Sequence, residues 1–216
     1  MSLTLYSHPF SSYCQKVLIA LYENDTPFDY RHMEEPGAAD ERVALWPFGK
    51  FPVLVDGERT VAESTIIIEH LDLHHRGSTR FLPDDPKAAL EVRFMDRFFD
   101  MYVMTPMNKP VAETLRPDGR RETAQAEAEK ELDVAYAWLE GVLAGRTWAA
   151  GEAFSMADCA AGPSLFYADW VHQIGKAYPA VRAYRSRLLA RPSFARAIEE
   201  ARRYRHYFPL GAPNRD

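Results

Sequence analysis

The residues best suited to chemistry stand at one predicted helix start, in the segment Ser11-Ser12-Tyr13-Cys14. A helix that begins here presents unpaired backbone N–H groups and the positive end of its dipole, where an anion is stabilised. Ser12 and Gln15 have the spacing of a capping box, so we expect the Ser12 hydroxyl to cap the helix. The Ser11 hydroxyl then remains free to donate a hydrogen bond to a bound anion such as a thiolate.

The cysteines and histidines have plainer interpretations. Cys14 is expected to point into the core and to be inert, because buried thiols behave as small hydrophobes. Cys14 and Cys159 are the only cysteines and fall in helix-like stretches, which favours reduced thiols over a disulfide framework. His70 and His74 are four residues apart on a predicted helix, but no third metal ligand of another type is evident. We therefore expect no metal site and interpret these histidines as favourable partners of a helix C-terminus.

The first part of the chain, up to about residue 76, alternates strand and helix signals. A strand at 3–6, a helical stripe and a strand at 28–33 form a βαβ unit, which makes a right-handed parallel crossover. Next come a weak helix and then two strands joined at Asp56-Gly57, a strong hairpin signal. A helix over 64–74 completes the order βαβ, α, ββα. This pattern predicts a small α/β domain.

The second part, residues 86–216, shows no convincing strand. Asp85-Pro86 is an N-cap followed by proline at the first helical position. The long helix that follows has an apolar stripe formed by Ala88, Val92, Met95, Phe99 and Tyr102, and we expect Pro106 and Pro110 to interrupt it. Further helices are predicted over 121–143, from a capping box at Ser155–Asp158, over 179–191 and over 192–204. An all-helical domain is therefore expected after a linker at 76–85.

Charge and hydropathy exclude two partner classes. The 216 residues include 31 acidic and 26 basic side chains, a formal charge of -5, so no positive field would hold a nucleic acid backbone. The longest aliphatic stretch is Ile66–Ile68, far short of the roughly 20 apolar residues that span a bilayer. With no leader peptide evident either, the cytoplasm is the expected compartment.

Four motifs in order resemble those of the soluble glutathione transferases, and the resemblance covers the whole chain. Ser11-Ser12-Tyr13-Cys14 stands where glutaredoxins carry Cys-Pro-Tyr-Cys, and it is similar to part of the zeta-class Ser-Ser-Cys signature. The other three motifs are a loop that resembles the family's cis-proline loop, a Glu-Ser helix start, and the capping box of the helical domain: Gly49–Leu54, Glu63–Leu71 and Phe154–Asp158. The resemblance implies a thioredoxin-like α/β domain over 1–76 and an all-helical domain over 86–216.

The resemblance also implies glutathione as co-substrate, with no prosthetic group. A cis-proline at Pro52 would expose the Phe51 backbone to the cysteinyl part of glutathione. The Ser64 hydroxyl and N–H would bind the γ-glutamyl carboxylate, Glu63 the ligand's ammonium and Lys50 the glycyl carboxylate. The thiol would then lie beside Ser11, which would stabilise the thiolate.

The resemblance is compatible with more than one activating residue and with more than one reaction. Tyr6 ends the first strand where other transferase classes carry an activating tyrosine, and Ser12 is the other nearby hydroxyl. A hydrophobic electrophile would occupy a pocket between the domains, with candidate lining residues Phe10, Tyr102, Met104 and Phe166. A homodimer is implied. A non-catalytic interaction module, an isomerase, a dehalogenase and a thiol reductase remain alternatives, although Ser11 replaces the cysteine that a reductase needs.

Overall fold

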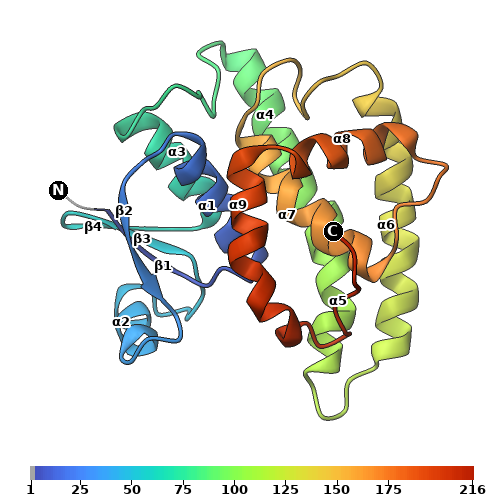
Figure 1. The fold of residues 1–216 in the computed structure, drawn as a ribbon, viewed down its shortest axis with the longest axis horizontal. Coiled ribbons are helices and arrows are strands. Elements are labelled where there is room, and N and C mark those ends of the chain that lie inside the picture. Colours follow the sequence, from blue (N-terminus) through green and yellow to red (C-terminus); the bar gives the residue numbers. More distant parts are fainter. Residues whose placement is uncertain (1–2) are drawn as a thin grey trace.

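The computed structural model describes residues 3–216, which form a small mixed sheet with its helices and a larger helical part beside it (Figure 1). The expected architecture, a thioredoxin-like α/β domain followed by an all-helical domain, is confirmed. Among these residues, no helix is both long enough and apolar enough to cross a membrane.

The sheet has the strand order β2-β1-β3-β4. Its strands are β1 (Leu3–Ser7), β2 (Phe28–His32), β3 (Val53–Asp56) and β4 (Arg59–Ala62). β1 pairs in parallel with β2, as the βαβ pattern predicts, and antiparallel with β3. The hairpin turn falls on Gly57-Glu58, one residue later than expected, because Asp56 still pairs with Arg59.

Three helices belong to the sheet domain: α1 (Ser12–Glu23), α2 (Ala38–Leu45) and α3 (Ser64–His74). In Figure 1, α1 and α3 lie on one side of the sheet and α2 on the other, and α1 lies next to the helical part. α1 is buried along most of its length because it also packs against α7 and α9 of the helical part. The start of α1 is therefore held between the two domains.

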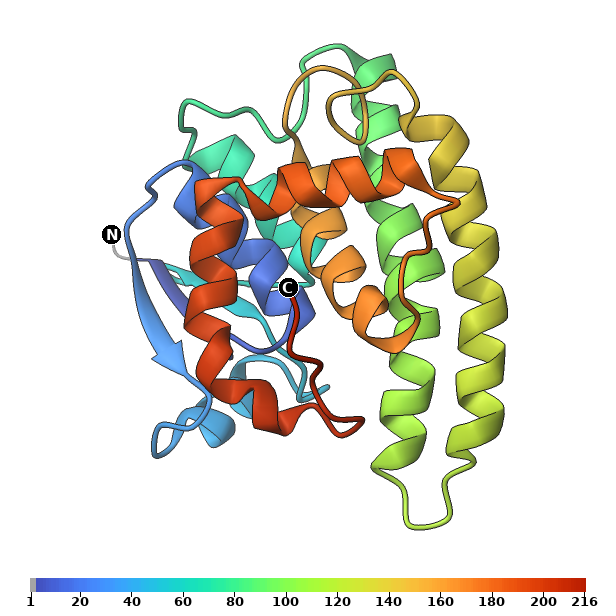
Figure 2. The same ribbon diagram turned by 45° about the vertical axis from the view of Figure 1, so that its right-hand side comes forward.

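The helical part contains six α-helices and two short irregular helices among the described residues. The α-helices are α4 (Pro86–Phe98), α5 (Thr105–Thr114), α6 (Arg121–Leu143), α7 (Met156–Val171), α8 (Pro179–Leu189) and α9 (Pro192–Ala201). Figure 2 shows α5 and α6 running side by side and joined at one end. α7 forms the centre of the core, with every residue from Met156 to Trp170 buried. The expected capping box of Ser155 and Asp158 opens it.

A π-helix over Phe99–Met104 corrects the prediction that the prolines interrupt the long helix. The backbone stays helical from Pro86 to Thr114, with Pro110 inside α5. A π turn adds one residue and rotates the following side chains around the axis. Tyr102 consequently leaves the apolar stripe and is 58% exposed, while Val103 and Met104 are buried.

A partly buried ion pair fastens α1 to the start of α9. The Arg191 guanidinium donates to both Glu23 carboxylate oxygens, and the Ser193 hydroxyl donates to Oε2 of Glu23 at 2.7 Å. These contacts join residues that are about 170 positions apart in the chain. The C-terminal helices therefore help to hold the helix that carries the predicted thiolate-binding start.

Candidate functional site

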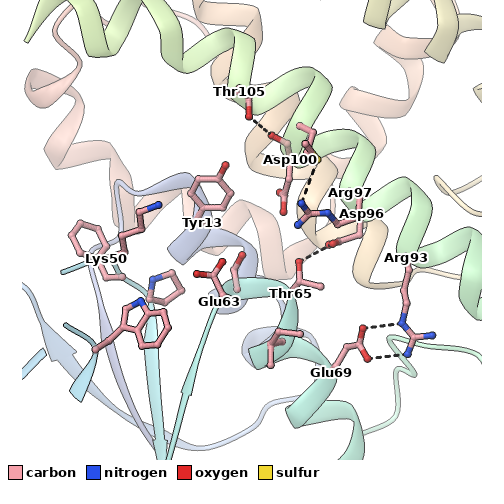
Figure 3. A pocket seen from close by; sticks show the side chains of 16 residues that line it. Tyr13, Lys50, Glu63, Thr65, Glu69, Arg93, Asp96, Arg97, Asp100 and Thr105 are labelled. Atoms are coloured by element: carbon pink, nitrogen blue, oxygen red, sulfur yellow. Dashed lines mark hydrogen bonds and ion pairs between the residues drawn. The ribbon is translucent and has the colours of Figure 1, made fainter. Parts of the chain in front are cut away.

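A cavity of about 590 Å³ lies between the two domains (Figure 3). The sheet domain contributes Tyr13, Trp46, Lys50, Phe51, Pro52, Glu63, Ser64, Thr65, Ile66 and Glu69. The helical domain contributes Arg93, Asp96, Arg97, Asp100, Met101 and Thr105. The cavity is thus walled by both domains, and four of the six residues from the helical side are charged.

All five residues predicted to bind glutathione line this cavity. Lys50, Phe51 and Pro52 come from the loop before β3, and Glu63 and Ser64 come from the start of α3. The Phe51–Pro52 peptide bond is cis, as the resemblance implied. The segments on either side of the β3–β4 hairpin therefore bring a cation, a carboxylate and a hydroxyl to one cavity wall.

The start of α3 has the geometry of an anion site. Glu63 precedes the helix with a φ of 69°, a left-handed conformation that is unusual for a residue with a side chain. Its side chain caps no helix N–H, so the carboxylate does not compete for the first backbone donors of α3. Ser64, 7% exposed, follows directly. A carboxylate bound here would meet the Ser64 hydroxyl and the free N–H groups.

Ser11, not Ser12, is the N-cap of α1, which corrects the expected capping. The Cys14 backbone N–H donates to Ser11 Oγ at 3.4 Å, and Ser12 is the first helical residue. The capping box fails because Gln15 turns inward, where its amide donates to Pro9 O at 2.9 Å and to the Tyr167 hydroxyl at 3.0 Å. Capping uses only a lone pair of Ser11 Oγ, so its proton is still available for donation.

None of the three hydroxyls predicted to activate the thiol, on Ser11, Ser12 and Tyr6, belongs to a residue that lines the cavity. The Tyr6 hydroxyl donates to Glu41 Oε2 at 3.2 Å, on the side of α2. Neither Ser11 nor Ser12 is among the cavity-lining residues, whereas Tyr13, two residues after Ser11, is. Cys14 is fully buried, and burial raises the pKa of its thiol, in agreement with an inert core cysteine.

The four residues expected to line an electrophile pocket do not line this cavity, which corrects that prediction. Met104 and Phe166 are 1% and 2% exposed and belong to the hydrophobic core. The Phe10 ring packs against Tyr167 and its carbonyl accepts from that hydroxyl at 2.9 Å. Tyr102 faces an outer groove, which shares only Met101 with the cavity. Helical periodicity marks apolar positions, but it does not distinguish core from cavity.

A buried charge network that sequence reasoning missed forms the floor between the domains. Lys16 on α1 is 1% exposed, and its ammonium lies 2.7 Å from Asp96 Oδ1 and 2.8 Å from Asp100 Oδ2. It also donates to Thr65 Oγ1 at 2.8 Å, and that hydroxyl donates to Asp96 Oδ2 at 2.7 Å. Burial, followed by the repulsion of Asp96, raises the pKa of Asp100 against the opposing effect of Lys16. The sequence feature that could have indicated this network is the pair Asp96 and Asp100, four residues apart beside the apolar stripe of the long helix.

Tyr13 and two arginines complete the polar wall. Burial, aided by Asp100, raises the pKa of Tyr13 to about 12, so its hydroxyl stays protonated and can donate a hydrogen bond. Arg93 binds Glu69 through two contacts of 2.9 Å. Arg97 pairs with no carboxylate among residues 3–216 and donates only to Met101 Sδ at 3.3 Å. Figure 3 shows Arg97 and Asp100 on the side opposite Lys50 and Glu63.

Comparisons with known proteins agree with this architecture. Residues 5–79 match the glutathione S-transferase N-terminal domain and residues 94–192 match the C-terminal domain. The stringent starvation protein A homolog of Haemophilus influenzae is 26% identical over 202 residues, which cover 92% of this chain and 91% of the relative.

Two solved structures are similar over almost the whole chain. FzlA from C. crescentus is 25% identical with a TM-score of 0.79 and 92% of each chain covered. A glutathione S-transferase from Methylobacillus flagellatus, solved with glutathione bound, is 26% identical with a TM-score of 0.76, covering 91% of this chain and 98% of that one. Because the family match extends through both domains, the chain belongs to the glutathione S-transferase family.

Proposed function

We propose that the protein is a glutathione transferase that binds glutathione in the interdomain cavity and uses its thiolate as a nucleophile. The observation that carries the proposal is the convergence of Lys50, Phe51, Pro52, Glu63 and Ser64 on one cavity. Residues 1–76 would form the glutathione-binding domain, and residues 86–216 would supply the wall that holds the second substrate. The relative solved with glutathione bound supports the choice of ligand.

Glutathione has two carboxylates and one ammonium, and the cavity offers a complement for each. The γ-glutamyl carboxylate binds at Ser64 and the N–H groups of α3, while its ammonium lies at Glu63. The Phe51 backbone pairs with the cysteinyl unit, and the exposed Lys50 ammonium meets the glycyl carboxylate. This orientation would direct the thiol toward the start of α1.

The thiol is activated there by Ser11 and the α1 N-terminus. A thiol with a pKa near 8.5 is only about 3% ionised at pH 7, and lowering its pKa by about two units requires roughly 2.7 kcal/mol of thiolate stabilisation. The Ser11 hydroxyl donates to the thiolate while its oxygen accepts from the Cys14 N–H. Tyr13 is the competing donor, because its protonated hydroxyl belongs to a cavity-lining side chain.

The second substrate is an electrophile with an apolar body and an acidic or strongly polar group. Tyr13 and Met101 offer it apolar surface within the cavity. Arg97 offers a guanidinium that has no carboxylate partner among the described residues. Attack by the thiolate would form a carbon–sulfur bond and expel a leaving group such as chloride.

The test distinguishes the role of Ser11 as a hydrogen-bond donor to the thiolate from its role as the N-cap of α1. Ser11→Gly removes the hydroxyl but costs a helix start only a few tenths of a kcal/mol, whereas Ser11→Thr keeps both functions. We expect Ser11→Gly to lower turnover of a chlorodinitrobenzene-type electrophile at least tenfold and to raise the pKa of the bound thiol, measured by thiolate absorbance. Ser11→Thr should restore most of the rate, and Ser12→Ala is the matched control.

Two results would overturn parts of the proposal. If Ser11→Gly keeps its rate while Tyr13→Phe loses it, Tyr13 is the activating donor. If calorimetry detects no glutathione binding to the unmodified protein, or if Ser64→Ala and Lys50→Met bind as tightly as it does, the cavity is not the glutathione site.

A non-catalytic interaction module is the second candidate function. It is favoured by the charged character of the helical wall and by relatives named for other properties, a stringent starvation protein A homolog and an FtsZ-localized protein. Glutathione binding without turnover of any electrophile would support this candidate. We place either activity in the cytoplasm, since both cysteines are free thiols.

We also propose a homodimer, in which the partner copy covers the outer groove of the helical domain. That groove exposes Phe94, Met101, Tyr102, Val134 and Trp138, which together form an unusually apolar surface on α4, the π-helix and α6. Sedimentation should give a dimer for the unmodified protein and a monomer for Phe94→Glu. A monomer in both cases would refute this assignment.

A further inference from the structure

The fold assembles a cluster of two imidazoles and one carboxylate away from the cavity. Nε2 of His70 and Nε2 of His75 lie 2.8 and 2.7 Å from the same oxygen, Oδ2 of Asp56. The sequence places His70 and His74 four residues apart on one helix, and no metal site was expected there because a third ligand of another type was missing. The β3–β4 hairpin supplies that ligand, and His75 takes the place of His74.

From this geometry we propose that Asp56, His70 and His75 bind one divalent late first-row transition-metal ion, with Zn²⁺ as the expected occupant. The three ligand atoms all lie within 4.8 Å of one another. In a tetrahedral zinc site with bonds of about 2.0–2.1 Å, neighbouring ligand atoms lie about 3.3 Å apart. Each oxygen–nitrogen contact therefore has to open by only about half an ångström. Two imidazoles with one carboxylate suit Zn²⁺ far better than Mg²⁺ or Ca²⁺.

The burial of the cluster suits a metal site in which three protein ligands leave one coordination position for an exchangeable water. The side chains of His70 and Asp56 are 8% and 16% exposed, so the packing of α3 and the hairpin holds them in place. His75 is 27% exposed, so solvent and a metal ion can reach the cluster from its side. Its backbone N–H donates to Leu71 O at 2.8 Å, which fixes it at the end of α3.

The available tautomers distinguish this cluster from a second group with similar composition, His8, His32 and Glu34. In that group backbone N–H groups donate to Nδ1 of His8 and Nδ1 of His32, at 3.2 and 3.1 Å. A neutral imidazole has one lone pair, which these contacts already use, so no Nε2 is available for a metal. Within residues 3–216, no N–H donates to Nδ1 of His70 or His75, and either ring can present Nε2 to the ion.

Metal binding would clamp the end of β3 to the end of α3. The site lies toward the opposite end of α3 from Ser64, since His70 and His75 are about 9 and 16 Å from Ser64 along the helix axis. Metal binding at this site can therefore be measured in the absence of glutathione. Failure of the glutathione proposal would leave this one standing, and the reverse also holds.

The experiment uses full-length, tag-free protein stripped of metal with a chelator. Titration with Zn²⁺ against a zinc-binding dye should give one site, and Co²⁺ should produce the visible absorption of a four-coordinate complex. A hundredfold excess of free Zn²⁺ over its Kd should raise the Tm by roughly 5–10 °C. His75→Gln and Asp56→Asn should each weaken binding at least about 100-fold, with folding checked by circular dichroism.

His74→Gln is the matched control, because His74 lies on the same helix with its ring centroid 4.6 Å from that of His70 but outside the cluster. It should bind Zn²⁺ as the unmodified protein does. Absence of stoichiometric Zn²⁺ binding by the unmodified protein would overturn the proposal. Binding by His75→Gln and Asp56→Asn at unchanged affinity would also overturn it, since the ion would then be held elsewhere.

Discussion

Replacing Lys16 with methionine tests the charge network beneath the cavity. Lys16→Met keeps the length of the side chain and removes an ammonium that donates hydrogen bonds to Thr65 and Asp100 and forms an ion pair with Asp96. The variant leaves two carboxylates in a site where Asp96 is fully buried and Asp100 is 8% exposed. Removing one partner from a buried ion pair costs about 3–5 kcal/mol of unfolding free energy.

The loss should be visible as a fall in Tm of roughly 6–20 °C at pH 8, measured by tryptophan fluorescence, given about 2–4 °C per kcal/mol at this chain length. This fall in Tm should become smaller as the pH is lowered toward 5. Burial already raises the pKa of Asp100, and removal of the ammonium raises it further. A carboxyl with a raised pKa binds its proton more readily in the folded state, so stability falls as pH rises through that pKa.

Lys109→Met is the matched control. Its ammonium contacts Glu131 Oε1 at 2.6 Å, but the two side chains are 33% and 47% exposed. Such a surface pair contributes about 1 kcal/mol or less. If Lys16→Met costs no more than Lys109→Met at every pH, Lys16 does not join the domains as described and the reasoning fails.

Three further predictions concern stability and reactivity. Ser155→Ala should lower the unfolding free energy by about 1–2 kcal/mol in urea titration, because it removes the capping box of α7, and an unchanged midpoint would contradict the capping. Cys14 and Cys159 should react with a disulfide reagent only after denaturation, since both are fully buried and burial raises each thiol pKa; rapid reaction in native buffer would disprove this burial. In metal-free protein, the hydrogen bond from His75, and then that from His70, lowers the pKa of Asp56. The stability this carboxylate contributes is present above its unfolded pKa of about 3.9 and is lost as pH falls through the lower folded pKa, so unfolding midpoints of Asp56→Asn and the unmodified protein should differ at pH 5–6 and converge in strong acid.

Local signals in the sequence determined the elements and the two motifs that we propose bind glutathione. Strand alternation and the Asp85-Pro86 start have physical causes within a few residues of the element they mark. The Gly49–Leu54 loop and the Glu63-Ser64 helix start are short motifs of the same kind. The conformation of each motif depends on the backbone nearby, so each could be identified from a few residues. That the two motifs meet at one cavity was expected from the family resemblance.

Tertiary structure decided which polar groups meet and which apolar groups are hidden. Lys16 lies 80 residues before Asp96, and nothing in either local pattern shows that α1 and α4 bring them within 2.7 Å. The π-helix turned Tyr102 outward and Met104 inward, which a regular helical period does not predict. Asp56 completed the histidine cluster only because the hairpin packs against the end of α3. Contacts of this kind depend on how elements pack across the chain, and the spacing of residues along one element carries no information about that packing.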